Sequence, residues 1–163
     1  MVQIAISYFY HIRFFKPYML PVSTAVWDPK WYHRNNDQDT TYIDKNGVIN
    51  GLRVPMLAPG ENCHNLCRGR ELCEDIPTGS CKFLQEYRKQ LDAIPFKEFC
   101  ESLTQCSEKL KGILKFKEDP ILVLMVHEKY DNPCSERVVL LDWFKQNGVD
   151  VQELKYPIKD NYN

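Results

Sequence analysis

The sequence lacks a long apolar run. Its longest uninterrupted stretch covers only residues 121–126, whereas a membrane-spanning helix needs roughly 20 apolar residues. The first residues also lack the basic start, the apolar core and the small-residue cleavage site of a secretion signal. We therefore expect a cytoplasmic protein with no membrane segment, whose cysteines stay reduced or bind a metal.

The sequence also lacks an excess of charge of either sign. It has 21 basic and 22 acidic residues, a net charge of -1, and no repeat or low-complexity tract. The net charge of the chain therefore does not indicate a nucleic-acid partner, although a local patch of basic residues is compatible with one. A length of 163 residues with 44% hydrophobic residues predicts one domain over residues 1–163 with its own core.

Apolar patterns along the chain predict alternating strands and helices. Residues 121–126 form the continuous apolar run that is typical of a strand buried on both faces. Residues 96–114 repeat apolar side chains at steps of three and four, which indicates an amphipathic helix. The other predicted elements are strands over 1–15, 19–27 and 149–156, helices over 81–92 (with Ser80 as N-cap) and 135–146, and a short hairpin around Asn46-Gly47.

The last three elements predict the fold class. A strand, a helix and a second strand joined by short connections form a βαβ unit, which requires parallel strands. We therefore predict a three-layer α/β sandwich of Rossmann-like type with a mostly parallel sheet. Residues 33–80 are rich in turn residues and contain four cysteines, so we predict a Cys-rich, loop-rich insertion there.

The turn between the strand at 121–126 and the following helix concentrates reactive side chains. Ligands of open α/β sheets bind at the carboxyl ends of strands, where helix N-termini offer unpaired N–H groups. There Arg137 is a candidate anion binder, Glu128 a candidate general acid or base, and Cys134 a candidate nucleophile. The alternatives are structural: Ser135 as helix cap, Arg137 in a local salt bridge, and His127 as a structural histidine. The Cys-x2-Arg spacing does not support cysteine phosphatase chemistry.

Ordered motifs at both ends of the chain resemble a bacterial and phage family, domain of unknown function 488. This resemblance covers roughly residues 4–32 and 96–156 and implies a Rossmann-like fold. It does not imply a particular reaction, because none is established for the family. The family's turn has a strand ending in Glu and then Cys-His-Arg opening a helix; this chain lacks that histidine and has one extra residue before the arginine. The matching segments are Ser7-Tyr8-Phe9, Pro29-Lys30-Trp31-Tyr32, Ile121 to Lys129, Asn132 to Arg137, Trp143 and Asn147-Gly148-Val149.

The seven cysteines divide into three groups. Cys100 and Cys106 lie on the apolar stripe of the predicted helix, so we expect both to be buried, and Cys134 lies at the strand-to-helix turn. Four thiolates within nineteen residues can enclose a structural zinc ion or hold an iron–sulfur cluster, although the usual Cys-x2-Cys pairs are absent, and unligated or disulfide-forming thiols remain the alternative. These four are Cys63, Cys67, Cys73 and Cys81.

Aromatic residues interleave with cations over the first 34 residues. This pattern is compatible with bases stacking on the rings, or with rings divided between the core and its rim. Trp31 and Tyr32 stand at the end of a strand, so we predict a nucleobase platform there, next to the Arg137 anion site. The predicted ligand-binding residues are Ser7, Tyr8, Trp31, Tyr32 and Ser135.

Two functional hypotheses follow from the sequence. The first is a pocket at the strand ends that binds a phosphorylated or nucleotide-like ligand, in an enzyme that modifies a nucleoside or nucleic acid. The second is a noncatalytic interaction module whose insertion is stabilised by zinc and binds a protein or nucleic-acid partner.

Overall fold

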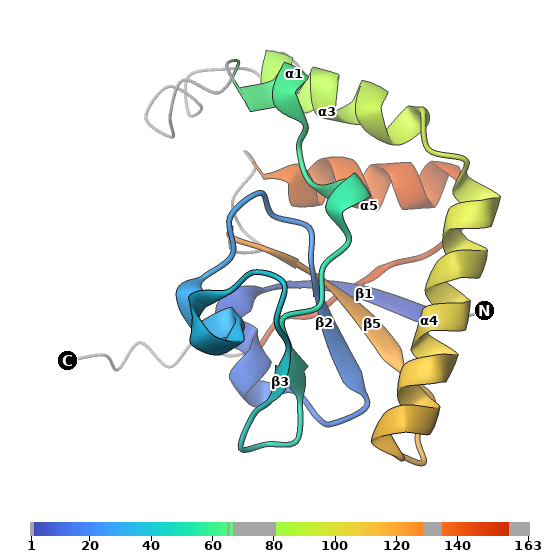
Figure 1. Ribbon diagram of the computed structural model, residues 1–163. Coiled ribbons are helices and arrows are strands. Elements are labelled where there is room, and N and C mark those ends of the chain that lie inside the picture. Colours follow the sequence, from blue (N-terminus) through green and yellow to red (C-terminus); the bar gives the residue numbers. More distant parts are fainter. Residues whose placement is uncertain (1, 65, 67–80, 129–134, 157–163) are drawn as a thin grey trace.

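A four-stranded parallel sheet forms the centre of the computed structural model, which describes residues 2–64, 66, 81–128 and 135–156 (Figure 1). The strand order is β2-β5-β1-β6. The predicted α/β class is therefore confirmed. The strands are β1 (Gln3–Tyr8), β2 (Met19–Ser23), β5 (Ile121–Val126) and β6 (Gln152–Glu153).

The apolar run of residues 121–126 forms β5, which pairs with strands on either side. Gln3 to Tyr8 of β1 pair in register with Ile121 to Val126, and β2 pairs along the other edge of β5. Alternate residues of β5 enter the two hydrophobic cores on opposite faces of the sheet, such as Leu124 on one face and Val123 on the other, which explains why β5 is apolar at every position. All of β5 except Ile121 is buried.

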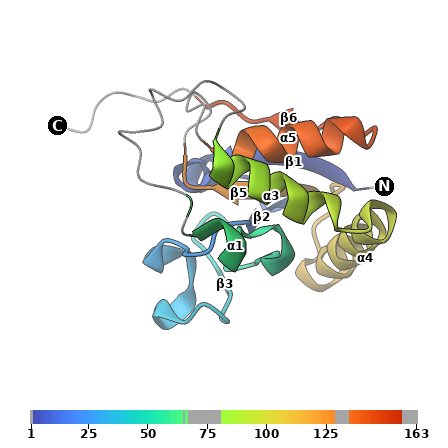
Figure 2. The same cartoon turned by 90° about the horizontal axis from the view of Figure 1, so that it is seen from above.

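Three long helices pack on one face of the sheet. They are α3 (Lys82–Asp92), α4 (Phe96–Leu114) and α5 (Glu136–Gln146), and α3 and α5 lie side by side (Figure 2). Alternate strand residues such as Ile6 and Leu124 point into this layer, where they join Trp143 in the larger hydrophobic core. The predicted helices and the amphipathic pattern of α4 are confirmed. The prediction of Ser80 as N-cap is wrong, because Cys81 is the residue that precedes the first helical residue of α3.

The other face of the sheet is covered differently. Residues Phe9–Phe14, which we predicted to continue the first strand, form the 3-10 helix η1 instead. Its Phe9 and Ile12 pack with Tyr32 and Val123 in a second hydrophobic core. In the described part of the chain this layer is built from 3-10 helices and loops. The remaining short elements are η2 (Lys30–Tyr32), η3 (Arg34–Asn36), β3 (Tyr42–Ile43), β4 (Ile49–Asn50), η4 (Pro55–Leu57) and α1 (Glu61–His64).

The first part of the predicted insertion contributes to the core. The antiparallel strands β3 and β4 confirm the hairpin around Asn46-Gly47. After the hairpin, the chain runs beside β2, where Ser23 N donates to Leu52 O (2.8 Å) and Val54 N donates to Ser23 O (2.9 Å). Leu57 is fully buried a few residues later. This segment is therefore held to the sheet as firmly as a regular element.

Three sequence predictions were wrong in extent or burial. The second strand ends at Ser23 rather than at residue 27, and β6 covers only two residues of the predicted 149–156. Cys100 is buried as predicted, but Cys106 is exposed because α4 packs on the sheet with a narrower stripe than the sequence indicated.

Among the described residues, none of the helices has the length and apolar character needed to cross a membrane.

Candidate functional site

The carboxyl ends of β1 and β5 and the start of α5 meet at one edge of the sheet. They enclose a narrow recess that has no room for a water molecule in this structure. The parallel topology therefore brings together four of the predicted site residues, Ser7, Tyr8, Glu128 and Arg137, although they lie up to 130 positions apart. The other residues that line the recess are Ile6, His11, Glu153 and Leu154.

Ser135 links the start of α5 to Glu128. Its hydroxyl accepts a hydrogen bond from the backbone N–H of Arg137 (3.1 Å), so Ser135 is the N-cap of α5 as the structural alternative predicted. The same hydroxyl donates to Oε2 of Glu128 (3.1 Å). The cap thus also orients the carboxylate that follows β5.

Glu136, in the first turn of α5, forms an acidic pair with Glu128. The pKa of Glu136 is raised from 4.5 to about 7. Burial is the main cause, and the charge of Glu128 and a hydrogen bond with that residue also raise this pKa. With this pKa the Glu136 carboxyl is partly protonated at neutral pH, because burial and the neighbouring Glu128 disfavour its ionisation. The pair can therefore give or take a proton near pH 7.

Arg137 is an ion-pair partner within the recess. Its Nη1 donates to Oε1 of Glu153, and its side chain is only 10% exposed. Glu153 is in place because β6 pairs with β1, where Leu154 N donates to Ile6 O (2.9 Å). The sequence left two interpretations of Arg137 open, an anion binder and a partner in a salt bridge. The structure contains the salt bridge.

Ser7 and His11 form a buried dyad on the other wall of the recess. Ser7 Oγ lies 2.6 Å from His11 Nδ1. Burial, and then the charge of Arg13, lower the pKa of His11 from 6.5 to about 4, so its ring is neutral at pH 7. Among the described residues, no group pairs with the buried Nε2. A neutral imidazole beside a hydroxyl is the arrangement that lets the hydroxyl lose its proton during a reaction.

The recess as a whole carries more negative than positive groups. Two carboxyl groups line it, those of Glu128 and Glu153, against one guanidinium, that of Arg137, and a neutral His11. An incoming phosphate has to compete with Glu153 for the guanidinium. A ligand that presents N–H and O–H donors instead finds acceptors already in place.

The aromatic residues divide between core and surface. Tyr32 is fully buried, and its hydroxyl donates to the carbonyl oxygens of Pro21 (2.8 Å) and Leu52 (2.6 Å). Trp31, by contrast, is 43% exposed. Trp31 lines a different recess from Arg137. The structure therefore separates the predicted aromatic platform from the predicted anion site.

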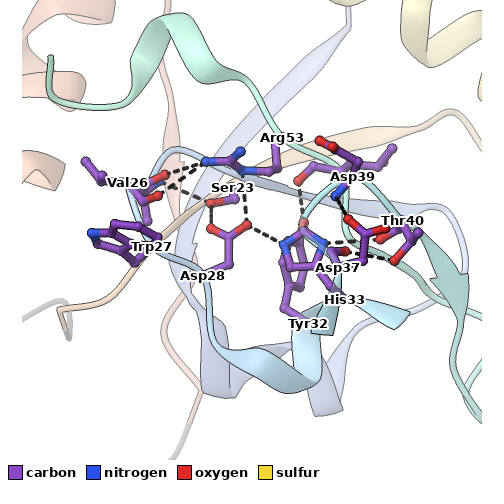
Figure 3. A network of polar contacts seen from close by, with 12 residues as sticks. Ser23, Val26, Trp27, Asp28, Tyr32, His33, Asp37, Asp39, Thr40 and Arg53 are labelled. Atoms are coloured by element: carbon purple, nitrogen blue, oxygen red, sulfur yellow. Dashed lines mark hydrogen bonds and ion pairs between the residues drawn. The ribbon is translucent and has the colours of Figure 1, made fainter. Parts of the chain in front are cut away.

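A buried charge cluster anchors the loop after β2 (Figure 3). The Asp28 side chain has no exposed surface; it accepts a hydrogen bond from Ser23 Oγ, lies 2.5 Å from His33 Nε2 and forms an ion pair with Arg53 Nε (3.1 Å). His33 Nδ1 lies 3.1 Å from the Thr40 carbonyl oxygen. Both ring nitrogens of His33 therefore face oxygen atoms.

This cluster is a structural element rather than a hydrolytic triad. Ser23 contacts the carboxylate of Asp28, whereas a nucleophilic serine of a triad contacts the histidine. The sequence analysis missed the cluster because its members are distributed over 31 positions with no motif spacing. The sequence analysis also missed the Ser7–His11 dyad, for which the i, i+4 spacing was the available signal.

Two of the four predicted metal ligands lie within the described residues. Cys63 is buried in the larger core, and burial raises the pKa of its thiol; Cys81 precedes α3 and is half-buried. Cys67 and Cys73 lie outside the described residues, as does Cys134. Within the described ranges, no three His, Cys, Asp or Glu side chains cluster closely enough to hold a metal ion. The zinc site, the iron–sulfur alternative and the interaction module stabilised by zinc stay predictions.

Comparisons with known proteins add no relative. No family model, no curated protein and no solved structure matches this chain. The resemblance to the family called domain of unknown function 488 therefore depends on the sequence motifs alone. The function has to be argued from the recess.

Proposed function

We propose that this chain is a Rossmann-like α/β protein, similar to the domain of unknown function 488 family, that binds and modifies a nucleoside or nucleotide at its strand-end recess. The order β2-β5-β1-β6 supports this proposal because it places the recess where the carboxyl ends of parallel strands meet a helix N-terminus. That edge is where ligands bind in open α/β sheets.

The observation that carries the proposal is the pair formed by Glu128 and Glu136. A general acid or base works best with a pKa near the operating pH, and Glu136 has a pKa of about 7. Glu128 lines the recess and is hydrogen-bonded to Glu136, so a proton of Glu136 can reach a bound ligand through Glu128. A purely structural N-terminus needs one carboxylate near the dipole, not a hydrogen-bonded pair.

The charge balance of the recess selects the part of the ligand that enters. Nucleobases carry amino and imino donors and ribose carries hydroxyl donors, which suit the carboxylate of Glu128. Arg137 can receive a phosphate only by exchanging it for Glu153. We therefore assign the nucleoside portion to the recess, which is closed in this structure and has to open to admit it, and the phosphate of a nucleotide to its mouth.

Ser7 and His11 complete the assignment. The neutral His11 can accept the proton of the Ser7 hydroxyl at 2.6 Å, which makes Ser7 a polar partner of the ligand and a candidate nucleophile. The role of nucleophile that the sequence suggested for Cys134 stays a prediction.

Calorimetric titration of the full chain tests the proposal. The ligands are the four common ribonucleosides and their 5′-monophosphates at pH 7, with Glu128→Gln as the test variant. The matched control is Glu98→Gln, which changes an exposed carboxylate in the first turn of α4. We expect at least one ligand to bind the wild type and the control equally, and Glu128→Gln to bind it at least tenfold more weakly.

The same samples test catalysis. Chromatography of the bound ligand after incubation with the wild type should show chemical conversion, which Glu136→Gln should slow. The proposal is wrong if none of the eight ligands binds the wild type, or if Glu128→Gln binds with unchanged affinity.

A further inference from the structure

A second recess, of about 260 Å³, lies between η1 and the β3–β4 hairpin. Tyr10, Trp31 and Tyr42 contribute aromatic surface to it, and Arg13, Lys45 and Asn46 contribute polar surface. This volume is slightly below that of typical small-molecule sites and the recess is open to solvent, so it suits one flat ring rather than a whole enclosed ligand. Because Tyr8 and His11 face the strand-end recess while Tyr10 and Arg13 face this one, η1 separates the two.

Two large aromatic rings are exposed in this recess although their neighbours hold them in place. Tyr10 is 61% exposed and Trp31 43% exposed, with ring centroids 6.4 Å apart. The buried rings of Phe9 and Tyr32 meet Trp31 edge-on, and the Tyr42 hydroxyl donates to the Trp31 carbonyl oxygen (2.5 Å). A fixed, exposed indole loses little conformational entropy when a planar ligand stacks on it.

Two exposed cations stand beside these rings. Arg13 and Lys45 are on the surface, and the Arg13 guanidinium lies 5.4 Å from the centre of the Phe14 ring. The one carboxylate of the recess, Asp44, is occupied: its Oδ1 accepts from Asn46 N and Val48 N, and its Oδ2 accepts from Asn50 Nδ2. The recess therefore presents aromatic surface next to positive charge, with its acidic group turned into the hairpin.

We propose that this recess binds single-stranded nucleic acid, with a base stacked on Trp31 and Tyr10 and the adjacent phosphates on Arg13 and Lys45. Exposed aromatic rings combined with cations are the features that such sites share. Arg13 and Lys45 beside the exposed rings favour a ligand that carries negative charge along its length, as single-stranded nucleic acid does. This binding function does not depend on the strand-end recess being catalytic.

Fluorescence anisotropy with labelled oligo(dT) and oligo(rU) of about 12 nucleotides tests the proposal at low salt. Trp31→Ala and Tyr10→Ala should each weaken binding about tenfold, because stacking of one base contributes that much. Trp27→Ala is the matched control, since Trp27 is a more exposed tryptophan (73%) that does not line the recess. Trp31→Phe should retain most of the affinity, which separates stacking from a folding defect.

The salt dependence provides a second measurement. Lys45→Ala should lower the slope of log affinity against log salt by about one, since each phosphate contact adds about that much. Lys97→Ala, on the exposed face of α4 across the molecule (Figure 1), should leave the slope unchanged. The proposal is overturned if neither oligonucleotide binds the wild type, if Trp31→Ala binds as well as the wild type, or if Trp27→Ala weakens binding equally. Failure here leaves nucleoside binding at Glu128 to be judged by its own titration.

Discussion

Replacing Glu136 by glutamine should change how the stability of the protein depends on pH. Burial, with the charge of Glu128, raises the pKa of Glu136 from 4.5 to about 7. Between these values the folded protein retains a proton that the unfolded chain has released, so rising pH favours unfolding. Glu136 should therefore cost the wild type stability progressively from pH 4.5 to 7, reaching roughly 3 kcal/mol above pH 7.

A second group acts in the opposite direction over part of this range. The pKa of His11 is lowered from 6.5 to about 4, chiefly by burial. Folded His11 binds fewer protons than unfolded His11 between these values, so its contribution to stability increases as pH rises through that window. The wild-type profile therefore combines two opposite slopes, and only the difference between variant and wild type isolates Glu136.

Urea denaturation followed by tryptophan fluorescence provides the assay, because Trp143 is buried in the larger core. At pH 4.5 Glu136→Gln and the wild type should have similar unfolding free energies. At pH 8 the variant should be more stable by roughly 3 kcal/mol, since glutamine has no charge to bury. Glu98→Gln should run parallel to the wild type. If the difference between Glu136→Gln and the wild type stays constant from pH 4.5 to 8, the pKa of Glu136 is not raised.

Two other predictions address the buried cluster and the cysteines. Asp28→Ala should lower the unfolding free energy by about 1.5–3 kcal/mol, because the buried His33 ring and the half-buried Arg53 guanidinium lose their charged partner. Breaking the exposed Lys89–Glu86 pair by Lys89→Ala should cost about 0.5 kcal/mol or less, and equal losses for the two variants would contradict a structural role for Asp28. If the cysteine cluster holds zinc, elemental analysis of protein purified without chelator should find one zinc per chain. Replacing the cysteine at either end of the cluster by serine should remove the zinc. Wild-type protein without metal would argue against the site. The ends of the cluster are Cys63 and Cys81.

The elements that the sequence predicted correctly depend on local or periodic signals. The apolar run of β5 and the spacing of α4 are visible without knowing any long-range contact. Ser135 was recognisable as a cap because the capping hydrogen bond spans two residues. The edge that carries Glu128 and Arg137 could be predicted because parallel strands place their carboxyl ends together.

The features that the sequence missed depend on which strand neighbours which. Tyr32 follows a strand and precedes a loop, yet Pro21 and Leu52 enclose its hydroxyl because the segment after the hairpin returns to β2. Residues 9–14 have strand-forming side chains, but the backbone turns into η1 so that Phe9 and Ile12 can cover the sheet. Neither outcome has a local signal, since tertiary packing overrides propensity at such positions.

The position of β5 in the sheet has a consequence for synthesis. Strands β1 and β2 leave the ribosome first but do not pair with each other, because β5 lies between them and is more than 100 residues further along the chain. Until β5 emerges, the apolar edges of both strands are open, and open edges of this kind promote association between chains. We therefore expect nascent chains that end before residue 121 to bind chaperones and to aggregate, and chains that extend past α5 to be released.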